Sequence, residues 1–73
     1  MKETTINYIE SKLERAKNYH GTNLVDTFEA QAFGALELYC RSVFEENPAA
    51  EAEMIDRWNN GWRLKFETLR FSN

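Results

Sequence analysis

The sequence predicts an all-α fold, a three-helix antiparallel bundle that forms a single helical domain over residues 1–73. The pair Asn47-Pro48 joins a favourable N-cap to a residue suited to the first helical position, so we expect a helix to begin at residue 48. Gly21 follows basic residues, as a left-handed glycine often does just beyond a helix C-terminus. Together with the spacing of the apolar residues, these signals predict helices near 4–20, 23–46 and 48–70.

The first and third segments each carry one narrow apolar stripe when successive residues are set 100° apart around a helix axis. In the first segment the stripe consists of Ile6, Ile9, Leu13, Ala16 and His20. In the third segment it consists of Ile55, Trp58, Trp62, Phe66 and Leu69. Both segments are therefore predicted to be amphipathic helices that bury one face.

The middle segment has a much broader apolar face. We expect Asn23 to cap it, with Asp26 in the first turn. The face consists of Leu24, Val25, Phe28, Ala32, Ala35, Leu36, Tyr39 and Val43, and it is widened by Phe33, Cys40 and Phe44. A helix that is apolar over so much of its surface needs neighbours on more than one side, so the middle helix is predicted to be central.

The stretch around Gly61 leaves two interpretations open. Trp62, Leu64 and Phe66 alternate with charged residues after an Asn-Gly pair, which is also the pattern of a strand after a turn. The segment before the turn is rich in Ala, Glu and Met, which favour helix. We therefore expect a helix, with a possible kink or break at residues 59–61.

Composition excludes several classes of protein. Cys40 is the only cysteine, so no intrachain disulfide forms and a reducing cytoplasm is the expected location. We expect neither a signal peptide nor a membrane span, because no run of about 18 apolar residues occurs. In size and composition the chain resembles the small accessory proteins of bacteria, phages or mobile elements, a resemblance that implies no particular site.

No motif in the sequence indicates catalysis, so we expect a protein that is not an enzyme and that needs no cofactor. Nucleophilic catalysis would require Cys40 beside His20, the only histidine, but neither residue lies in a recognisable motif. One histidine and one cysteine are too few for the usual zinc ligand sets. The three glycines are too scattered for a phosphate-binding loop.

A surplus of apolar residues suggests the leading hypothesis, a protein–protein interaction or self-associating accessory module. A bundle of this size cannot easily cover every large apolar group, because a domain near 60 residues buries only about 60% of its unfolded surface. Exposed aromatic groups are typical of protein interfaces. The candidate partner-binding residues are Phe33, Phe44, Leu64 and Phe71, and the expected partner is another protein or a second copy in a homodimer.

The alternative hypothesis is a weak nucleic-acid-binding or regulatory protein. Its candidate residues lie at offsets of four, three and four on the back of the first helix: Tyr8, Lys12, Arg15 and Tyr19. Basic groups interleaved with aromatic rings suit single-stranded nucleic acid or its backbone. The net charge of -3 argues against this partner, because nucleic-acid-binding domains are usually strongly basic.

Overall fold

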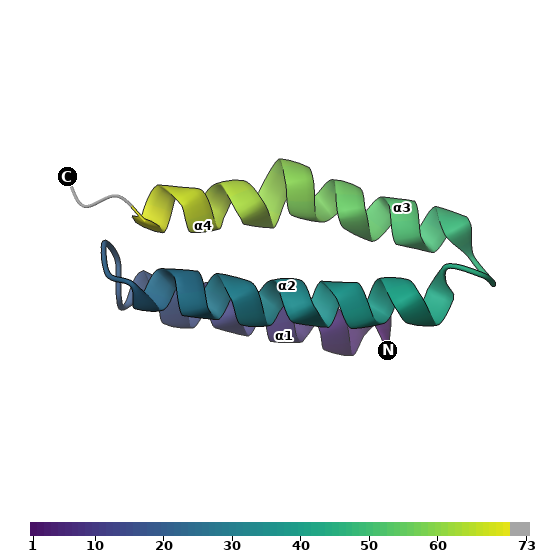
Figure 1. Cartoon of the computed structure of the whole chain (residues 1–73), viewed down its shortest axis with the longest axis horizontal. Coiled ribbons are helices and arrows are strands. Elements are labelled where there is room, and N and C mark those ends of the chain that lie inside the picture. Colours follow the sequence, from purple (N-terminus) through teal and green to yellow (C-terminus); the bar gives the residue numbers. More distant parts are fainter. Residues whose placement is uncertain (71–73) are drawn as a thin grey trace.

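The computed structural model describes residues 1–70, which form three antiparallel rods, so the predicted all-α three-helix bundle is confirmed. The first two rods are helix α1 (Lys2–Lys17) and helix α2 (Leu24–Val43). The third rod is continuous and consists of α3 (Pro48–Arg57), one π-helical turn η1 (Trp58–Trp62) and α4 (Arg63–Arg70). We call this third rod the C-terminal helix. It lies along one side of the α1–α2 pair (Figure 1).

The core runs along the axis of the bundle, and all three rods contribute to it. Phe66, Ile9, Met54 and Val25 are the largest of its fully buried side chains. The other core members are Ile6, Leu13, Ala16, Phe28, Ala32, Leu36, Tyr39, Trp58 and Trp62. Because α2 supplies core residues toward both neighbours, the prediction that the middle helix is central agrees with the structure.

The turn between α1 and α2 departs from the sequence prediction at His20. The first helix runs over Lys2–Lys17 rather than 4–20, so His20 lies in the turn and is exposed, and the prediction that it joins the buried stripe is wrong. Gly21 has φ of 79°, which confirms the left-handed glycine. Its N–H donates to the Leu69 carbonyl oxygen at 2.7 Å, which ties this turn to the end of α4.

The two asparagines predicted as caps behave differently. Asn47 Oδ1 accepts a hydrogen bond from the Ala50 N–H at 3.1 Å, which confirms the helix start at Pro48. Asn23 has helical backbone angles and makes no side-chain cap, so the prediction that it caps α2 is wrong. Thr22 Oγ1 instead accepts from the Leu24 N–H at 3.3 Å.

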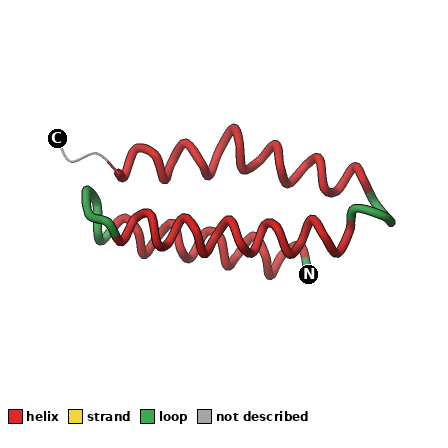
Figure 2. The backbone as a smooth tube through the Cα atoms, viewed as in Figure 1, coloured by secondary structure: helices red, strands yellow, loops and turns green. Residues whose placement is uncertain are grey.

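The C-terminal helix is continuous through Gly61, and residues 1–70 contain no strand, so the strand interpretation is wrong. The tube drawing shows the C-terminal helix as one unbroken helical segment, with a loop at each end of the bundle (Figure 2). The expected irregularity at residues 59–61 is a widened π-helical turn rather than a break. Such a turn holds about one residue more than an α-helical turn.

The widened turn changes which residue is buried at the start of the C-terminal helix. In a regular α-helix the residue two turns before Trp62 is seven positions back, Ile55. Since η1 holds one extra residue, the matching position is eight back, and Met54 is fully buried there while Ile55 is 40% exposed. The prediction that Ile55 belongs to the buried stripe is therefore wrong.

Candidate functional site

An open groove lies between α1 and α2. Its volume is about 550 Å³ and its walls are largely apolar. The residues that line it are Met1, Thr4, Thr5, Tyr8, Gln31, Gly34, Ala35, Leu38 and Tyr39. It lies within the size range of pockets that bind ligands or anchor residues of partners.

The groove is open because α2 carries the small residues Gly34 and Ala35 there, and larger side chains at these positions would fill it. A Cβ atom added to Gly34 would meet no atom within 4 Å. Leu38, one turn further along the same face of α2, is 66% exposed and stands at the groove's edge. At the end of the groove, the Ser42 hydroxyl donates to the Tyr39 carbonyl oxygen at 2.7 Å and lies 3.5 Å from Met1 Sδ. A glycine beside an exposed leucine makes a hollow next to a protrusion.

The four residues of the nucleic-acid hypothesis form one cluster, in which Lys12, Arg15 and Tyr19 lie around the ring of Phe28 and Tyr8 lies under Lys12. Lys12 Nζ lies 5.1 Å from the centroid of Tyr8 and 5.9 Å from that of Phe28. The Arg15 guanidinium lies 5.3 Å from the Phe28 centroid, and the Tyr19 ring lies 5.7 Å from it. These distances are those of cation–π and aromatic pairs. We call Tyr8, Lys12, Arg15, Tyr19 and Phe28 the basic aromatic cluster.

The basic aromatic cluster continues the groove along the interface between α1 and α2. We call the surface that carries both of them the α1–α2 seam. Tyr8 belongs to both, since it lines the groove and also lies under the Lys12 ammonium. The α1–α2 seam is therefore apolar over one half and cationic over the other.

The residues of the leading hypothesis are not gathered in the same way. Phe33 is 43% exposed and packs against Trp58, with ring centroids 5.3 Å apart. Phe44 lies eleven residues further along α2, about 16 Å away, at the C-cap of that helix. Leu64 is exposed on α4, and Phe71 lies outside the described residues.

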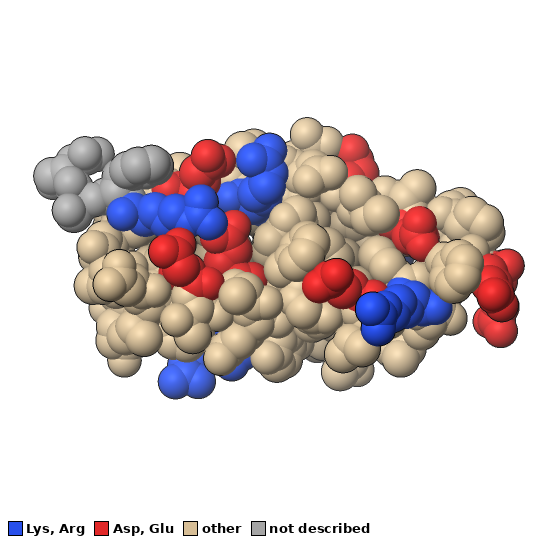
Figure 3. All heavy atoms as spheres, in the orientation of Figure 1, with Lys and Arg blue, Asp and Glu red and all other residues tan. Residues whose placement is uncertain are grey.

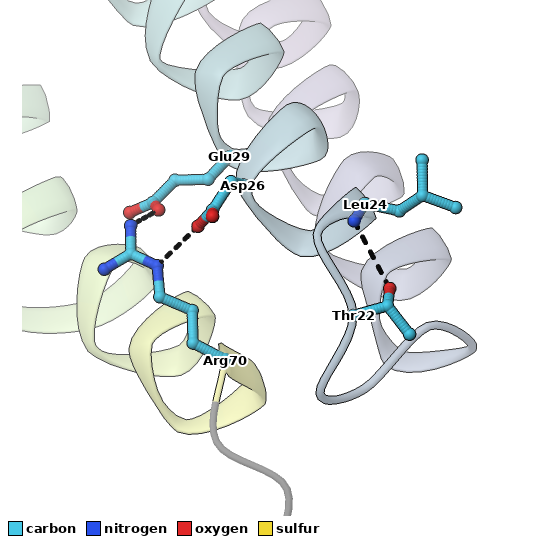
Figure 4. Close-up of polar contacts among 5 residues, drawn as sticks. All are labelled: Thr22, Leu24, Asp26, Glu29 and Arg70. Atoms are coloured by element: carbon cyan, nitrogen blue, oxygen red, sulfur yellow. Dashed lines mark hydrogen bonds and ion pairs between the residues drawn. The ribbon is translucent and has the colours of Figure 1, made fainter.

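Ion pairs close the bundle beside Phe33. Arg70 Nε donates to Asp26 Oδ1 at 2.8 Å, and Arg70 Nη2 donates to Glu29 Oε1 (Figure 4). In the space-filling view this is a place where blue and red side chains meet between the C-terminal helix and α2 (Figure 3). The same residues line a cavity of about 440 Å³ together with Phe33 and Trp58. The acidic side chains of α2 are thus partly neutralised at this end.

A polar cavity of about 330 Å³ lies beside the π-helical turn. Asn60 Nδ2 donates to Asp56 Oδ1 at 2.6 Å, and the Arg57 guanidinium lies 5.0 Å from the centroid of Trp62. These contacts join side chains of α3 to side chains of η1. We assign them a structural role.

The structure does not bring Cys40 and His20 together. His20 precedes α2, whereas Cys40 lies sixteen residues into that helix, about 24 Å further along its axis. Burial raises the pKa of the Cys40 thiol, which disfavours the nucleophilic thiolate. Over residues 1–70 no three His, Cys, Asp or Glu side chains are placed to share a metal ion.

Sequence reasoning missed the groove because Leu38 falls on the polar back of α2. A signal for it exists: Gly34 and Leu38 are one turn apart on that back, where a solvated face would carry polar residues. None of the described helices has both the length and the apolar character needed to cross a membrane. No protein-family model, curated protein or solved structure matches the chain.

Proposed function

We propose that this chain is a non-enzymatic interaction module that binds a protein through the groove between α1 and α2. The observation that carries the proposal is the exposed Leu38 beside the hollow over Gly34. An apolar patch of this kind, with a charged group at one end, is typical of surfaces that bind protein helices. A reducing cytoplasm suits such a protein, because its single cysteine forms no intrachain disulfide.

This proposal keeps the function expected from the sequence and moves its site. Phe33 already packs against Trp58, and the described residues provide no shared cavity for Phe33, Phe44 and Leu64. The α1–α2 seam, by contrast, combines a hollow, a protruding leucine and a cationic end on one continuous surface.

A photo-crosslinking amino acid placed at position 38 tests the proposal in cells that produce the protein. We expect a crosslinked protein product from position 38. The matched control is the same substitution at position 64, since Leu64 is 45% exposed and lies on a different rod. Equal crosslinking from both positions, or none from position 38, would contradict the proposed site.

Nucleic-acid binding is a second candidate, supported by the gathering of Lys12 and Arg15 between tyrosine rings. It predicts an electrophoretic shift of single-stranded DNA or RNA at low salt that weakens steeply as salt rises. Changing Lys12 and Arg15 to Ala together should abolish the shift. Changing Arg63, which pairs with Glu67 on α4, should leave it intact.

A further inference from the structure

We infer that the groove between α1 and α2 binds an amphipathic helix of another protein whose apolar stripe is flanked by acidic residues. This inference rests on the proposed function, because it names the kind of segment that occupies the same groove. Three features of the α1–α2 seam support it: the place of the groove in the bundle, the spacing of its walls and the sign of its charge.

The groove lies on the side of the α1–α2 pair that the C-terminal helix leaves open. That helix contacts both α1 and α2, yet none of its residues lines the groove. Ion pairs join it to its two neighbours, through Lys2 and Glu53 on one side and through Arg70 on the other. Within residues 1–70 no ion pair joins α1 to α2. The groove is therefore free to receive a further helix.

The walls of the groove have the spacing that accommodates a helix. Their residues recur every three or four positions along both helices: Met1, Thr4, Thr5 and Tyr8 on α1, and Gln31, Gly34, Ala35 and Leu38 on α2. Rows with this spacing run along a helix surface, and a neighbouring helix packs with its own row of side chains between them. The C-terminal helix packs against the same pair with one such row: Met54, Trp58, Trp62 and Phe66. In the open groove, the space over Gly34 can hold one large apolar side chain of the incoming helix.

The α1 wall of the seam carries basic side chains and no carboxylate. With successive residues about 100° apart, Lys12 and Arg15 lie within about 40° of Tyr8 around the helix axis. Both rest on the Phe28 ring, and neither forms an ion pair within residues 1–70. The acidic residues of α1 all lie about 120° or more from Tyr8, on the other side of the helix: Glu3, Glu10 and Glu14.

The α2 wall has the same sign at the opposite end of the groove. Over Leu24–Val43, Arg41 is the only charged residue within about 60° of Leu38 around the axis. The Met1 ammonium belongs to the same end, where Met1 Sδ lies beside Ser42. The nearest carboxylates, those of Glu45 and Glu46, follow the end of α2. The groove thus has cations at both ends, although the chain as a whole carries a net charge of -3.

This pattern of charge selects the occupant. Cations that lack partners at both ends of an apolar groove are complementary to carboxylates at both ends of an apolar stripe. A basic helix would place like charges against each other, and so would a second copy of this face. Met1 and Lys12 are eleven residues or about 16 Å apart on α1, so a helix of about three turns reaches from one basic end to the other.

Identifying the protein segment that crosslinks to position 38 tests the inference. We expect a segment of another protein with apolar residues at helical spacing and with Asp or Glu within one turn of each end of that stripe. A segment with Lys or Arg at those places, or a segment of this same chain, would overturn the inference. Crosslinking to lipid or nucleic acid without protein would overturn it as well.

A synthetic peptide with the crosslinked sequence then measures the role of charge. Its dissociation constant for the purified full-length chain is followed by fluorescence anisotropy. K12Q together with R15Q should raise that constant about tenfold, as expected when two partly exposed ion pairs are lost. R63Q together with K65Q removes the same number of charges from α4 and should leave it unchanged. Equal binding by the original chain and the K12Q/R15Q chain would overturn the acidic occupant.

Filling the hollow separates binding from folding. A Cβ atom at Gly34 meets nothing within 4 Å, so G34L places its side chain in the groove without a clash inside the bundle. We expect G34L to weaken peptide binding by about tenfold or more, with the helical circular dichroism retained. G61L is the matched control, because Gly61 is equally open but lies on the C-terminal helix. Unchanged binding by G34L would overturn the seat of the helix over Gly34.

The inference and the proposed function fail in different ways. If position 38 crosslinks to no protein, the proposed function itself is overturned. If position 38 crosslinks to a protein segment that is not acidic, or whose binding does not depend on Lys12 and Arg15, the groove remains a protein-binding site and only the acidic helix is overturned.

Discussion

The central helix α2 and the C-terminal helix each bury one stripe of residues in the core, but the spacing of the two stripes differs. α2 is a regular α-helix over Leu24–Val43, and its core residues follow α-helical spacing. The C-terminal helix buries Met54, Trp58, Trp62 and Phe66, which are spaced four apart throughout. In a regular α-helix each step of four would rotate the stripe by about 40°, so three steps would carry it out of the core.

The π-helical turn is what keeps that stripe aligned. By holding one extra residue between Trp58 and Trp62, η1 takes up the accumulated rotation and returns Phe66 to the core. The comparison shows that the C-terminal helix contains one residue more than a regular α-helix would need to bury the same stripe. α2 contains no such extra residue.

Single-residue deletions should give the largest difference between the two helices. Deleting exposed Glu37 from α2 rotates Tyr39 by about 100° relative to Leu36, so we expect a loss of about 3–5 kcal/mol in unfolding free energy, comparable to truncating a buried aromatic residue. Deleting Gly61 should convert η1 into an α-helical turn with the stripe intact and cost less than about 1 kcal/mol. Urea denaturation measures both, and equal losses would contradict the account of η1.

The two candidate caps should differ by a smaller amount. N47A removes the acceptor for the Ala50 N–H and should destabilise the protein by about 1 kcal/mol. N23A is the matched control, because Asn23 makes no cap, and its effect should stay within about 0.5 kcal/mol. Thermal unfolding followed by circular dichroism measures the difference, and a larger loss for N23A would show that the start of α2 is capped differently.

The two helical glycines should respond in the same direction. Neither Gly34 nor Gly61 has positive φ, and a Cβ atom at either position meets nothing within 4 Å. G34A and G61A should therefore each raise the unfolding free energy by about 0.4–1 kcal/mol. Chemical denaturation at low protein concentration measures this gain for the single chain. A loss for G61A alone would mean that the π-helical turn requires glycine.

The smallest effect is expected from the ion pair that joins α1 to α3. The hydrogen bond from Lys2 lowers the pKa of the Glu53 carboxyl and raises that of the Lys2 ammonium. A lowered carboxyl pKa means that the pair stabilises the fold above the ordinary value of 4.5 and is lost as pH falls through the lower folded-state value. The lysine contribution is lost only as pH rises beyond 10.5.

E53Q should accordingly lower the melting temperature slightly at pH 7. The difference from the original chain should shrink as the pH is taken from 5 toward 2, because Glu53 is then protonated in both states. E67Q, on the exposed face of α4 with only a 3.8 Å contact to Arg63, is the matched control. A difference for E53Q that grows on acidification would contradict the stabilising role of the pair.

The candidate sites show that the spacing of residues along the sequence predicts which side chains share a face of one helix, but not how residues on different helices are placed. Tyr8, Lys12, Arg15 and Tyr19 share one helix, so their offsets alone placed them on one face, and the structure added only Phe28 beneath them. Phe33 and Leu64 lie on different helices, and their relation depended on how those helices pack. Leu38 was passed over because a single helix projection does not show which part of a polar face borders a hollow.

The sequence by itself determined the helical class, the helix start at Pro48, the left-handed Gly21 and most of the core, because these features depend on neighbours within a few residues along the chain. Only the tertiary structure decided that Met54 rather than Ile55 is buried and that His20 stays outside. It also decided that a groove opens between α1 and α2. These outcomes depend on how each helix is rotated about its axis relative to the others. That rotation is set by the packing of large side chains from all three helices in one core.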